Sequence, residues 1–303
     1  MSHPVIQADR PTPLLPMTDR VDPASDRGDS STDGDGSVTD RDGFATDPAT
    51  ATALARLYDL DLQDDPGDLG LWLALADRAD GPVLELAAGS GRLAVPIAAA
   101  GHRVTALDID PAMLERGRAR AADAGLAGDA ISWVEADMRT VRLPDAGTFA
   151  LSFIALNSLM LLPTREAQGA AFATMAAHLR PGGIAAVDVW VPDAEDLARF
   201  DGRLMLEWPR ADPVSGRLVT KIGSAQHDAA SGMVTLTTIY EEGHQGETPV
   251  RWWRRDRLRL VRAEDLVRYA EDAGLRVEFV AGGYELDPLG PGADRAVLIA
   301  VQP

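Results

Sequence analysis

Small residues and carboxylates between residues 83 and 138 have the types and spacing to bind a nucleotide. The stretch VLELAAGSGR places Glu85 two residues before Ala87, and Gly89 and Gly91 continue an alternation of small residues. Asp108 lies 17 residues beyond Gly91. Glycine lets backbone approach a ligand closely, and a carboxylate about 20 residues further along usually binds ribose hydroxyls. The pattern predicts a nucleotide-binding turn between a strand and a helix.

The spacing within this turn also separates two kinds of cofactor. A dinucleotide fingerprint has the form G-x-G-x-x-G, whereas small residues here occupy every second position from Ala87 to Gly91. Pyrophosphate binds to helix N–H groups, and Glu85 would repel it. A cofactor with an amino group and a sulfonium suits Glu85 better. The stretch therefore favours S-adenosylmethionine over a nicotinamide dinucleotide.

The segments around this turn alternate as they do in an α/β protein. Apolar strands separated by helices predict a parallel sheet that is covered on both faces. Together with two closing strands, this gives a doubly wound, seven-stranded, mostly parallel sheet. Asp110 is expected to cap its helix, and the helix over 164–183 is expected to stop at its glycines. The expected strands are residues 81–87, 102–109, 131–138, 148–159, 183–191, 276–285 and 295–302, and the expected helices are 49–60, 67–80, 91–101, 110–125, 164–183 and 262–275.

Composition divides the chain into three regions. Residues 1–45 are rich in Asp, Ser, Thr and Gly, which predicts a disordered acidic tail. Residues 46–192 and 262–303 carry the strand and helix alternation of the expected cofactor-binding domain. Residues 193–261 hold short alternating segments with the turn signals DPVSG and DAASG. They predict an antiparallel, β-rich insert before the last helix, and we expect it to cover the active site.

Bulk composition argues against several kinds of site and partner. The chain has no cysteine and a net charge of −18, which removes thiolate chemistry and disfavours nucleic acid and anionic membranes. No apolar run approaches the ~18 residues of a membrane span, and the first residues do not resemble a signal peptide, so a cytoplasmic protein is expected. Histidines and carboxylates do not occur at metal-ligand spacing, so no metal site is expected. The sequence indicates no oligomeric state.

The motifs, taken in order, resemble those of class I S-adenosylmethionine-dependent methyltransferases, within the bacterial small-molecule group. VLELAAGSGR, VTALDIDPAML, VEADMR, FALSFIALNSLMLL and LRPGGIAAVDV are similar to five successive family motifs, and the match covers roughly residues 50–303. The resemblance implies that Asp108 binds ribose, that Asp137 meets the adenine amino group and that Met138 meets its ring. The cofactor-binding residues that it implies are Glu85, Ala87, Gly89, Gly91, Arg92, Asp108, Ile109, Asp137, Met138 and Ala155.

The resemblance further implies methyl transfer to a nitrogen or oxygen of a small molecule by in-line displacement. Candidate substrate-side groups are Tyr58 in the first helix, Asn157 beyond the fourth strand and Tyr240 in the insert. No dedicated general base is visible, and the catalytic residues stay unassigned. Two alternatives are a non-catalytic adenosylmethionine-binding module and, less favoured, a nicotinamide-dependent oxidoreductase.

Some residues depart from the family pattern or invite a functional interpretation. Ala87 replaces a glycine, which we expect to require only a small residue, and Leu161 stands where relatives often carry histidine. His178 lies near a helix end, where a positive charge suits the helix dipole. The segment RWWRRDR, residues 251–257, is expected to pack its tryptophans inward and turn its arginines to water rather than to bind nucleic acid.

Overall fold

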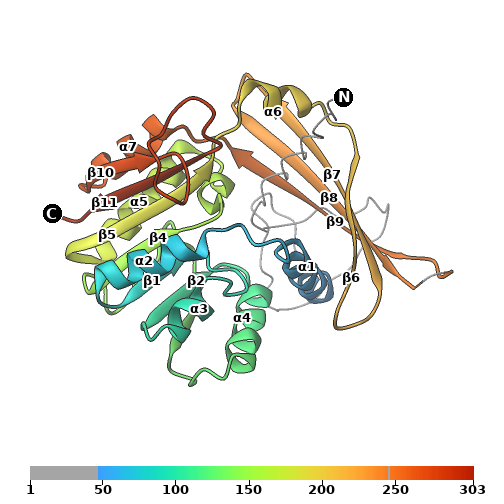
Figure 1. Ribbon diagram of the computed structural model, residues 1–303, viewed down its shortest axis with the longest axis horizontal. Helices are drawn as coiled ribbons and strands as arrows, with labels where there is room; N and C mark the ends of the chain where they lie inside the picture. The colour runs from blue at the N-terminus through green and yellow to red at the C-terminus, as the bar shows by residue number, and fades with distance from the viewer. Residues whose placement is uncertain (1–46, 245) are drawn as a thin grey trace, which may run out of the picture.

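The protein contains two separate β-sheets, with a helix between them (Figure 1). The computed structural model describes residues 47–244 and 246–303. The predicted acidic tail, residues 1–45, therefore lies outside the described residues. Helix α1 (Pro48–Asp61) occupies the space between the seven-stranded sheet and the four-stranded sheet.

The larger sheet has the topology that the sequence predicts. Its strands are β1 (Val83–Leu86), β2 (Val104–Asp108), β3 (Ile131–Glu135), β4 (Phe149–Ile154), β5 (Leu179–Trp190), β10 (Arg276–Ala281) and β11 (Arg295–Val301). Their order is β10-β11-β5-β4-β1-β2-β3, with β11 antiparallel to both of its neighbours and the other pairs parallel. The doubly wound, mostly parallel, seven-stranded sheet is confirmed. Because the strand order reverses between β1 and β4, a crevice is expected at their carboxyl ends.

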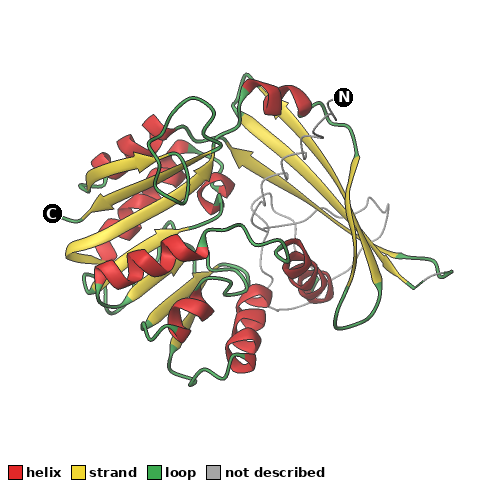
Figure 2. Ribbon diagram, viewed as in Figure 1, coloured by secondary structure: helices red, strands yellow, loops and turns green. Residues whose placement is uncertain are grey.

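Helices cover both faces of this sheet (Figure 2). One face carries α2 (Leu69–Ala79), α3 (Ala94–Ala99) and α4 (Pro111–Asp123), and the other carries α5 (Arg165–His178) and α7 (Ala263–Asp272). Each face has its own buried cluster, and β1 contributes Val83 to one and Leu84 to the other. Trp72 of α2 stacks on Phe153 of β4 with 4.6 Å between the ring centroids. Burial on both faces explains why the central strands are apolar throughout.

Local signals set the start of α4, as expected. Asp110 precedes the helix in an extended conformation, and its Oδ1 accepts a hydrogen bond from the backbone N–H of Ala112 at 2.8 Å. Pro111 occupies the first turn, where its missing N–H removes no intrahelical bond. The predicted cap is confirmed.

Among the element boundaries that differ from the sequence prediction, two have a clear physical reason. Strand β4 ends at Ile154, before the predicted residue 159, because Leu156 and Asn157 adopt left-handed φ angles of 48° and 68°. A short 3₁₀ helix, η1 (Ser158–Leu161), follows. Helix α5 ends at His178 and does not reach its glycines. The residue after the helix is extended, and Pro181 disfavours helix at the residue before it.

His178 is neutral, so the expected positive charge at the end of α5 is wrong. Its Nε2 accepts a hydrogen bond from the backbone N–H of Leu143 at 3.0 Å and therefore carries no proton. Its Nδ1 lies 2.7 Å from the carbonyl oxygen of Thr174 and donates to it. The ring fastens the loop before β4 to the helix through two neutral hydrogen bonds.

The four-stranded sheet is antiparallel and follows α6 (Ala194–Arg199). It consists of β6 (Met205–Ala211), β7 (Leu218–Asp228), β8 (Met233–Gly243) and β9 (Val250–Arg259), in that order. Asp61 at the end of α1 accepts hydrogen bonds from Tyr240 Oη at 2.8 Å and Trp208 Nε1 at 3.0 Å. The Asp61 carboxylate also lies 2.9 Å from Lys221 Nζ. These contacts attach the sheet to α1.

Strand β9 buries an arginine that the sequence pattern assigned to the surface. Trp252 and Trp253 are half-buried, whereas Arg254 and Asp256 are only 3% and 2% exposed. Arg254 Nη2 lies 2.9 Å from Asp256 Oδ2. The prediction that arginines of this segment face water is therefore wrong for Arg254.

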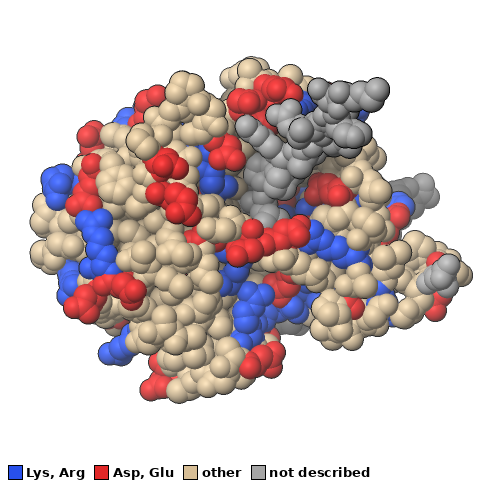
Figure 3. Space-filling model, in the orientation of Figure 1, with Lys and Arg blue, Asp and Glu red and all other residues tan. Residues whose placement is uncertain are grey.

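Acidic and basic side chains are interspersed over the face of the molecule in Figure 3. Within residues 47–244 and 246–303, no helix is both long and apolar enough to traverse a lipid bilayer.

Candidate functional site

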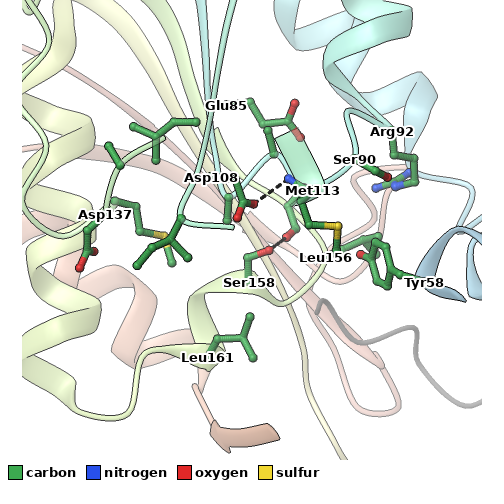
Figure 4. Close-up of a pocket in the computed structure, with 18 residues that line it drawn as sticks. Tyr58, Glu85, Ser90, Arg92, Asp108, Met113, Asp137, Leu156, Ser158 and Leu161 are labelled. Atoms are coloured by element: carbon green, nitrogen blue, oxygen red, sulfur yellow. Dashed lines mark hydrogen bonds between the residues drawn. The ribbon is translucent and has the colours of Figure 1, made fainter. Parts of the chain in front are cut away.

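A cavity lies at the carboxyl ends of β1, β2, β3 and β4, beside α1 and α4 (Figure 4). It contains about 690 Å³ of empty space, counting the part that is open to solvent. Predicted residues that line it are Tyr58, Glu85, Ala87, Gly89, Arg92, Asp108, Ile109, Asp137, Met138 and Ala155. Lining residues that the sequence prediction missed are Ala88, Ser90, Leu107, Met113, Ala136, Leu156, Ser158 and Leu161.

The turn after β1 bends through left-handed backbone conformations. Ala87 has φ 60° and Gly89 has φ 54°. Alanine in this region costs about 1–2 kcal/mol because its Cβ approaches the following carbonyl oxygen. The prediction that this position requires only a small residue is therefore incomplete, because the backbone also has to adopt the left-handed form. The N–H of Gly89 donates to Asp108 Oδ2 at 2.7 Å, which ties the turn to the end of β2.

Gly91 does not line the cavity, although it was predicted to bind the cofactor. It has φ 74°, and a Cβ added there would lie 2.6 Å from the ring of Trp133. Gly117 of α4 faces the same ring, and a Cβ added to this glycine would lie 2.4 Å from it. Both glycines leave room for the ring of Trp133, which extends from β3 to the turn and α4. The structure therefore gives Gly91 a packing role.

Glu85 is a buried carboxylate with an unused acceptor. It is 3% exposed, and among the described residues nothing donates to its Oε2. Burial raises the pKa of Glu85 to about 8, while the nearby Arg92 opposes the shift. A positively charged ligand group beside this oxygen would favour the ionised form. The site can therefore accept a cation.

Asp108 combines burial with backbone hydrogen bonds. Its Oδ2 accepts from Gly89, and its Oδ1 accepts from the N–H of Asp110 at 2.9 Å. Burial raises the pKa of Asp108 to about 6, although these N–H groups stabilise the ionised form. Figure 4 shows Asp108 near the middle of the cavity, with Glu85 and Asp137 at different sides of it.

Arg92 and Asp137 both line the cavity and are both held by ion pairs. Arg92 forms a bidentate pair with the fully buried Asp68, at 2.6 and 2.7 Å, and Asp68 also accepts from Trp72 Nε1 at 2.9 Å. Asp137 accepts from the N–H of Arg139 at 2.8 Å and from its guanidinium. These contacts fix the two side chains on opposite parts of the rim.

The turn between β4 and η1 is held by a buried polar network that was not predicted from the sequence. Asp188 of β5 accepts from the N–H of Leu156 at 2.8 Å and from Tyr284 Oη at 3.1 Å. Arg295 of β11 pairs with Asp188 and donates to Asn157 Oδ1 at 3.1 Å. Asp188 within the apolar run VDVWV was the available signal, because a buried carboxylate requires partners.

Asn157 and Tyr240 do not line the cavity, although both were predicted to face the substrate. Asn157 is fully buried, and its Oδ1 accepts from the N–H of Trp190. Tyr240 is also fully buried, with its hydroxyl on Asp61. Both side chains hold the cavity wall in place. Only Tyr58 of the three predicted substrate-side residues reaches the cavity, where burial raises its pKa above the usual value for tyrosine.

Across the part of the chain that the structure describes, no three histidines, cysteines or carboxylates are grouped so that they could hold a metal ion.

Comparison with protein families identifies a segment of the chain. Residues 83–183 match the family described as "Methyltransferase domain". This segment runs from β1 into β5 and contains the turn, Glu85, Asp108 and Asp137. The chain is also 34% identical over 123 residues to an uncharacterized protein of Mycobacterium tuberculosis strain H37Rv. That alignment covers 41% of this chain and 40% of the relative, so the match spans about two fifths of the relative's length.

Solved structures with the same fold cover most of the chain. The CcbJ methyltransferase from Streptomyces caelestis superposes with a TM-score of 0.67 at 20% identity, over 80% of this chain and 98% of its own. SAM-bound CalS10, an amino pentose methyltransferase from Micromonospora echinaspora, superposes with a TM-score of 0.61 at 20% identity, over 82% of this chain and 97% of its own. The sugar N-methyltransferase KedS8 from Streptoalloteichus superposes with a TM-score of 0.64 at 18% identity, over 92% of this chain and 99% of its own. The predicted resemblance to the methyltransferase fold is confirmed.

Proposed function

We propose that this chain, whose residues 83–183 match the family described as a methyltransferase domain, transfers a methyl group from S-adenosylmethionine to a small-molecule acceptor. One observation carries the proposal. Glu85, Asp108 and Asp137 belong to three successive strand ends and line one cavity beside the turn at Gly89. A ligand with a cationic end, a ribose diol and an adenine amine offers a partner to each of these carboxylates.

The residues present fit this cofactor. Glu85 Oε2 is buried and lacks a donor within the described chain, and an ammonium or sulfonium is the kind of group that would ionise it. At Gly89 a Cβ would meet nothing within 4 Å, so the turn leaves open space beside the backbone. A pyrophosphate in the same place would face the Glu85 carboxylate. The cavity therefore favours adenosylmethionine over a nicotinamide dinucleotide.

We assign the protein groups as follows. Glu85 faces the cationic end, Asp108 accepts from the ribose hydroxyls, Asp137 accepts from the adenine amine, and Ile109 and Met138 enclose the ring. When bound, adenosylmethionine supplies a methyl group that its sulfonium already activates. The protein's own contribution is to orient the acceptor for in-line attack and to exclude water.

The lining of the cavity favours a nitrogen nucleophile. A hydroxyl acceptor needs a general base with a pKa near the working pH. No histidine or lysine lines the cavity in the described chain, and burial keeps Tyr58 protonated by raising its pKa. The two lining carboxylates with raised pKa values, Glu85 and Asp108, are assigned to the cofactor. A neutral amine attacks without such a base. The names of CalS10 and KedS8, an amino pentose methyltransferase and a sugar N-methyltransferase, support an amine-bearing small molecule.

Ligand-dependent thermal stability tests the cofactor, and adenosylhomocysteine release tests the reaction. Ligands that bind only the folded state raise the melting temperature, so adenosylmethionine and adenosylhomocysteine should stabilise the protein whereas NADH should not. A panel of small amines should then yield adenosylhomocysteine, with matched alcohols inactive. Stabilisation by NADH alone would contradict the proposal. Cofactor binding without release across the panel would favour a non-catalytic binding module.

A further inference from the structure

The inner face of β9 carries a buried ion pair to which the proposed function assigns no role. Side chains alternate between the faces of a strand, so Trp252, Arg254, Asp256 and Leu258 share one face. Trp252 lies opposite Tyr240 in the strand register, and the Tyr240 hydroxyl bonds to α1. This face of the four-stranded sheet therefore points toward α1 and the larger sheet, as the arrangement in Figure 1 also shows.

The ion pair lies between two points at which β9 meets the wall of the cavity. Trp252 packs against the hydrophobic cluster that contains Tyr58, and Leu258 belongs to the cluster that contains Leu161. Tyr58 and Leu161 both line the cavity. Neither Arg254 nor Asp256 lines the cavity itself. Arg254 lies close enough to Tyr58 for its charge to oppose the raised pKa of that tyrosine, so an acceptor that extends from the cavity past Tyr58 would approach the ion pair.

Arg254 has donors that its neighbours do not use. Its Nη2 lies 2.9 Å from Asp256 Oδ2. Its Nε and Nη1 are buried and have no hydrogen-bond partner within the described residues. Buried N–H groups without acceptors are costly, and a buried ion pair is often no more stabilising than apolar side chains of the same size. A ligand oxygen that accepts hydrogen bonds from Nε and Nη1 would explain why these donors are buried without a protein acceptor.

We propose that Arg254 binds an oxyanionic group, a carboxylate or a phosphate, on the methyl acceptor. The inference rests on the proposed function and deepens it, because it makes the acceptor a small amine that also carries an acid. Guanidinium bonds most strongly to charged oxygens. Asp256 positions Arg254 through Nη2 and leaves Nε and Nη1 to the ligand. Burial lowers the pKa of Arg254, but Asp256 together with Tyr240 and Asp61 raises it above its usual value, so the guanidinium stays charged.

Small oxyanions test this site without knowledge of the acceptor. The melting temperature of the protein saturated with adenosylhomocysteine is measured against sodium phosphate and sodium acetate, with sodium chloride at equal ionic strength as reference. We expect saturable stabilisation beyond chloride, with at least about tenfold weaker apparent affinity in R254Q, which loses a charged donor. Because R254Q removes only the positive charge of this ion pair, the double variant R254Q/D256N removes both charges. R257Q, an exposed arginine on the other face of β9, is the matched control.

The outcomes of this experiment show which oxyanion the acceptor carries and whether Arg254 binds an oxyanion at all. A larger response to phosphate indicates phosphorylated acceptors, and a larger response to acetate indicates carboxylic acids. No response beyond chloride, or an equal response in R254Q/D256N and R257Q, would overturn the inference. The response to adenosylhomocysteine is measured first in every variant and should be unchanged. A protein that binds the oxyanions through Arg254 but not adenosylhomocysteine would contradict the proposed function alone.

Discussion

The strand ends that line the cavity and the four-stranded sheet beyond α1 are built in different ways. On the β1–β3 side, each carboxylate lies in or just beyond the end of its own strand. Its partners are near in sequence, as in the bond from Gly89 to Asp108, 19 residues apart. On the four-stranded sheet, the bond between Tyr240 and Asp61 joins residues 179 apart. The cofactor side, as we call the strand ends that we assign to the cofactor, is therefore a property of one continuous segment. The acceptor side, as we call the region of the four-stranded sheet that we assign to the acceptor, exists only when distant parts of the chain meet.

This difference predicts that substitutions on the two sides have separable effects. Changes at the strand ends should weaken cofactor binding and leave the four-stranded sheet attached. Changes in that sheet should weaken its attachment or acceptor binding and leave cofactor affinity nearly unchanged.

Substitution of Asp108 is expected to have the largest effect. D108A removes the carboxylate that we assign to the ribose hydroxyls and that also accepts from Gly89 and Asp110. Hydrogen bonds to a charged group contribute about 1.5–3 kcal/mol each, so adenosylmethionine affinity should fall about 100-fold. Titration calorimetry measures the loss. D129N, an exposed aspartate away from the cavity, is the control, and equal affinities in the two variants would remove Asp108 from the site.

A smaller effect, and one on stability, is expected at Tyr240. Y240F deletes the hydroxyl that donates to Asp61, a charge-assisted bond in a buried place, and should lower the free energy of unfolding by about 1–3 kcal/mol. Adenosylmethionine affinity should change less than about twofold, because Tyr240 does not line the cavity.

Y269F is the matched control for this substitution. Tyr269 donates to Gln168 at 3.0 Å and joins α7 to α5 on the other side of the molecule. Hydrogen exchange should increase in α1 and β8 for Y240F, and in α5 and α7 for Y269F. Equal patterns in the two variants would show that the bond to Asp61 is not what attaches the four-stranded sheet.

The cofactor side was largely predictable because its signals are local. Strand periodicity located β1, β2 and β3, and parallel strands bring their carboxyl ends to one edge. The same reasoning could not determine backbone conformation. It therefore missed the left-handed φ of Ala87 and the packing of Gly91 on Trp133.

The acceptor side was less predictable because burial there depends on partners far away in sequence. Tyr240 and Asn157 were predicted to face the substrate because of their chemical type and position, yet each forms a buried hydrogen bond within the protein. Alternation along β9 predicted arginines at the surface, but the contact of this strand with α1 and η1 turns Arg254 and Asp256 inward. Sequence patterns show which residues share a face and not what covers that face.

The protonation of Glu85 tests the central claim, that the cationic end of adenosylmethionine binds beside this carboxylate. In the free protein burial raises the pKa of Glu85 from 4.5 to about 8. Between pH 4.5 and about pH 8, the folded state therefore holds a proton on Glu85 that the unfolded state has lost. The free energy of unfolding should fall as the pH rises through this range. A bound cation lowers this pKa, so binding should release the proton and strengthen as pH rises from about 6 toward 8.

Titration calorimetry at about pH 7, in two buffers with different ionisation enthalpies, counts this proton directly. Unsubstituted protein should release close to one proton for each adenosylmethionine bound, and E85Q should release none and bind more weakly. Equal proton release by the two proteins, or none by the unsubstituted protein, would contradict the account.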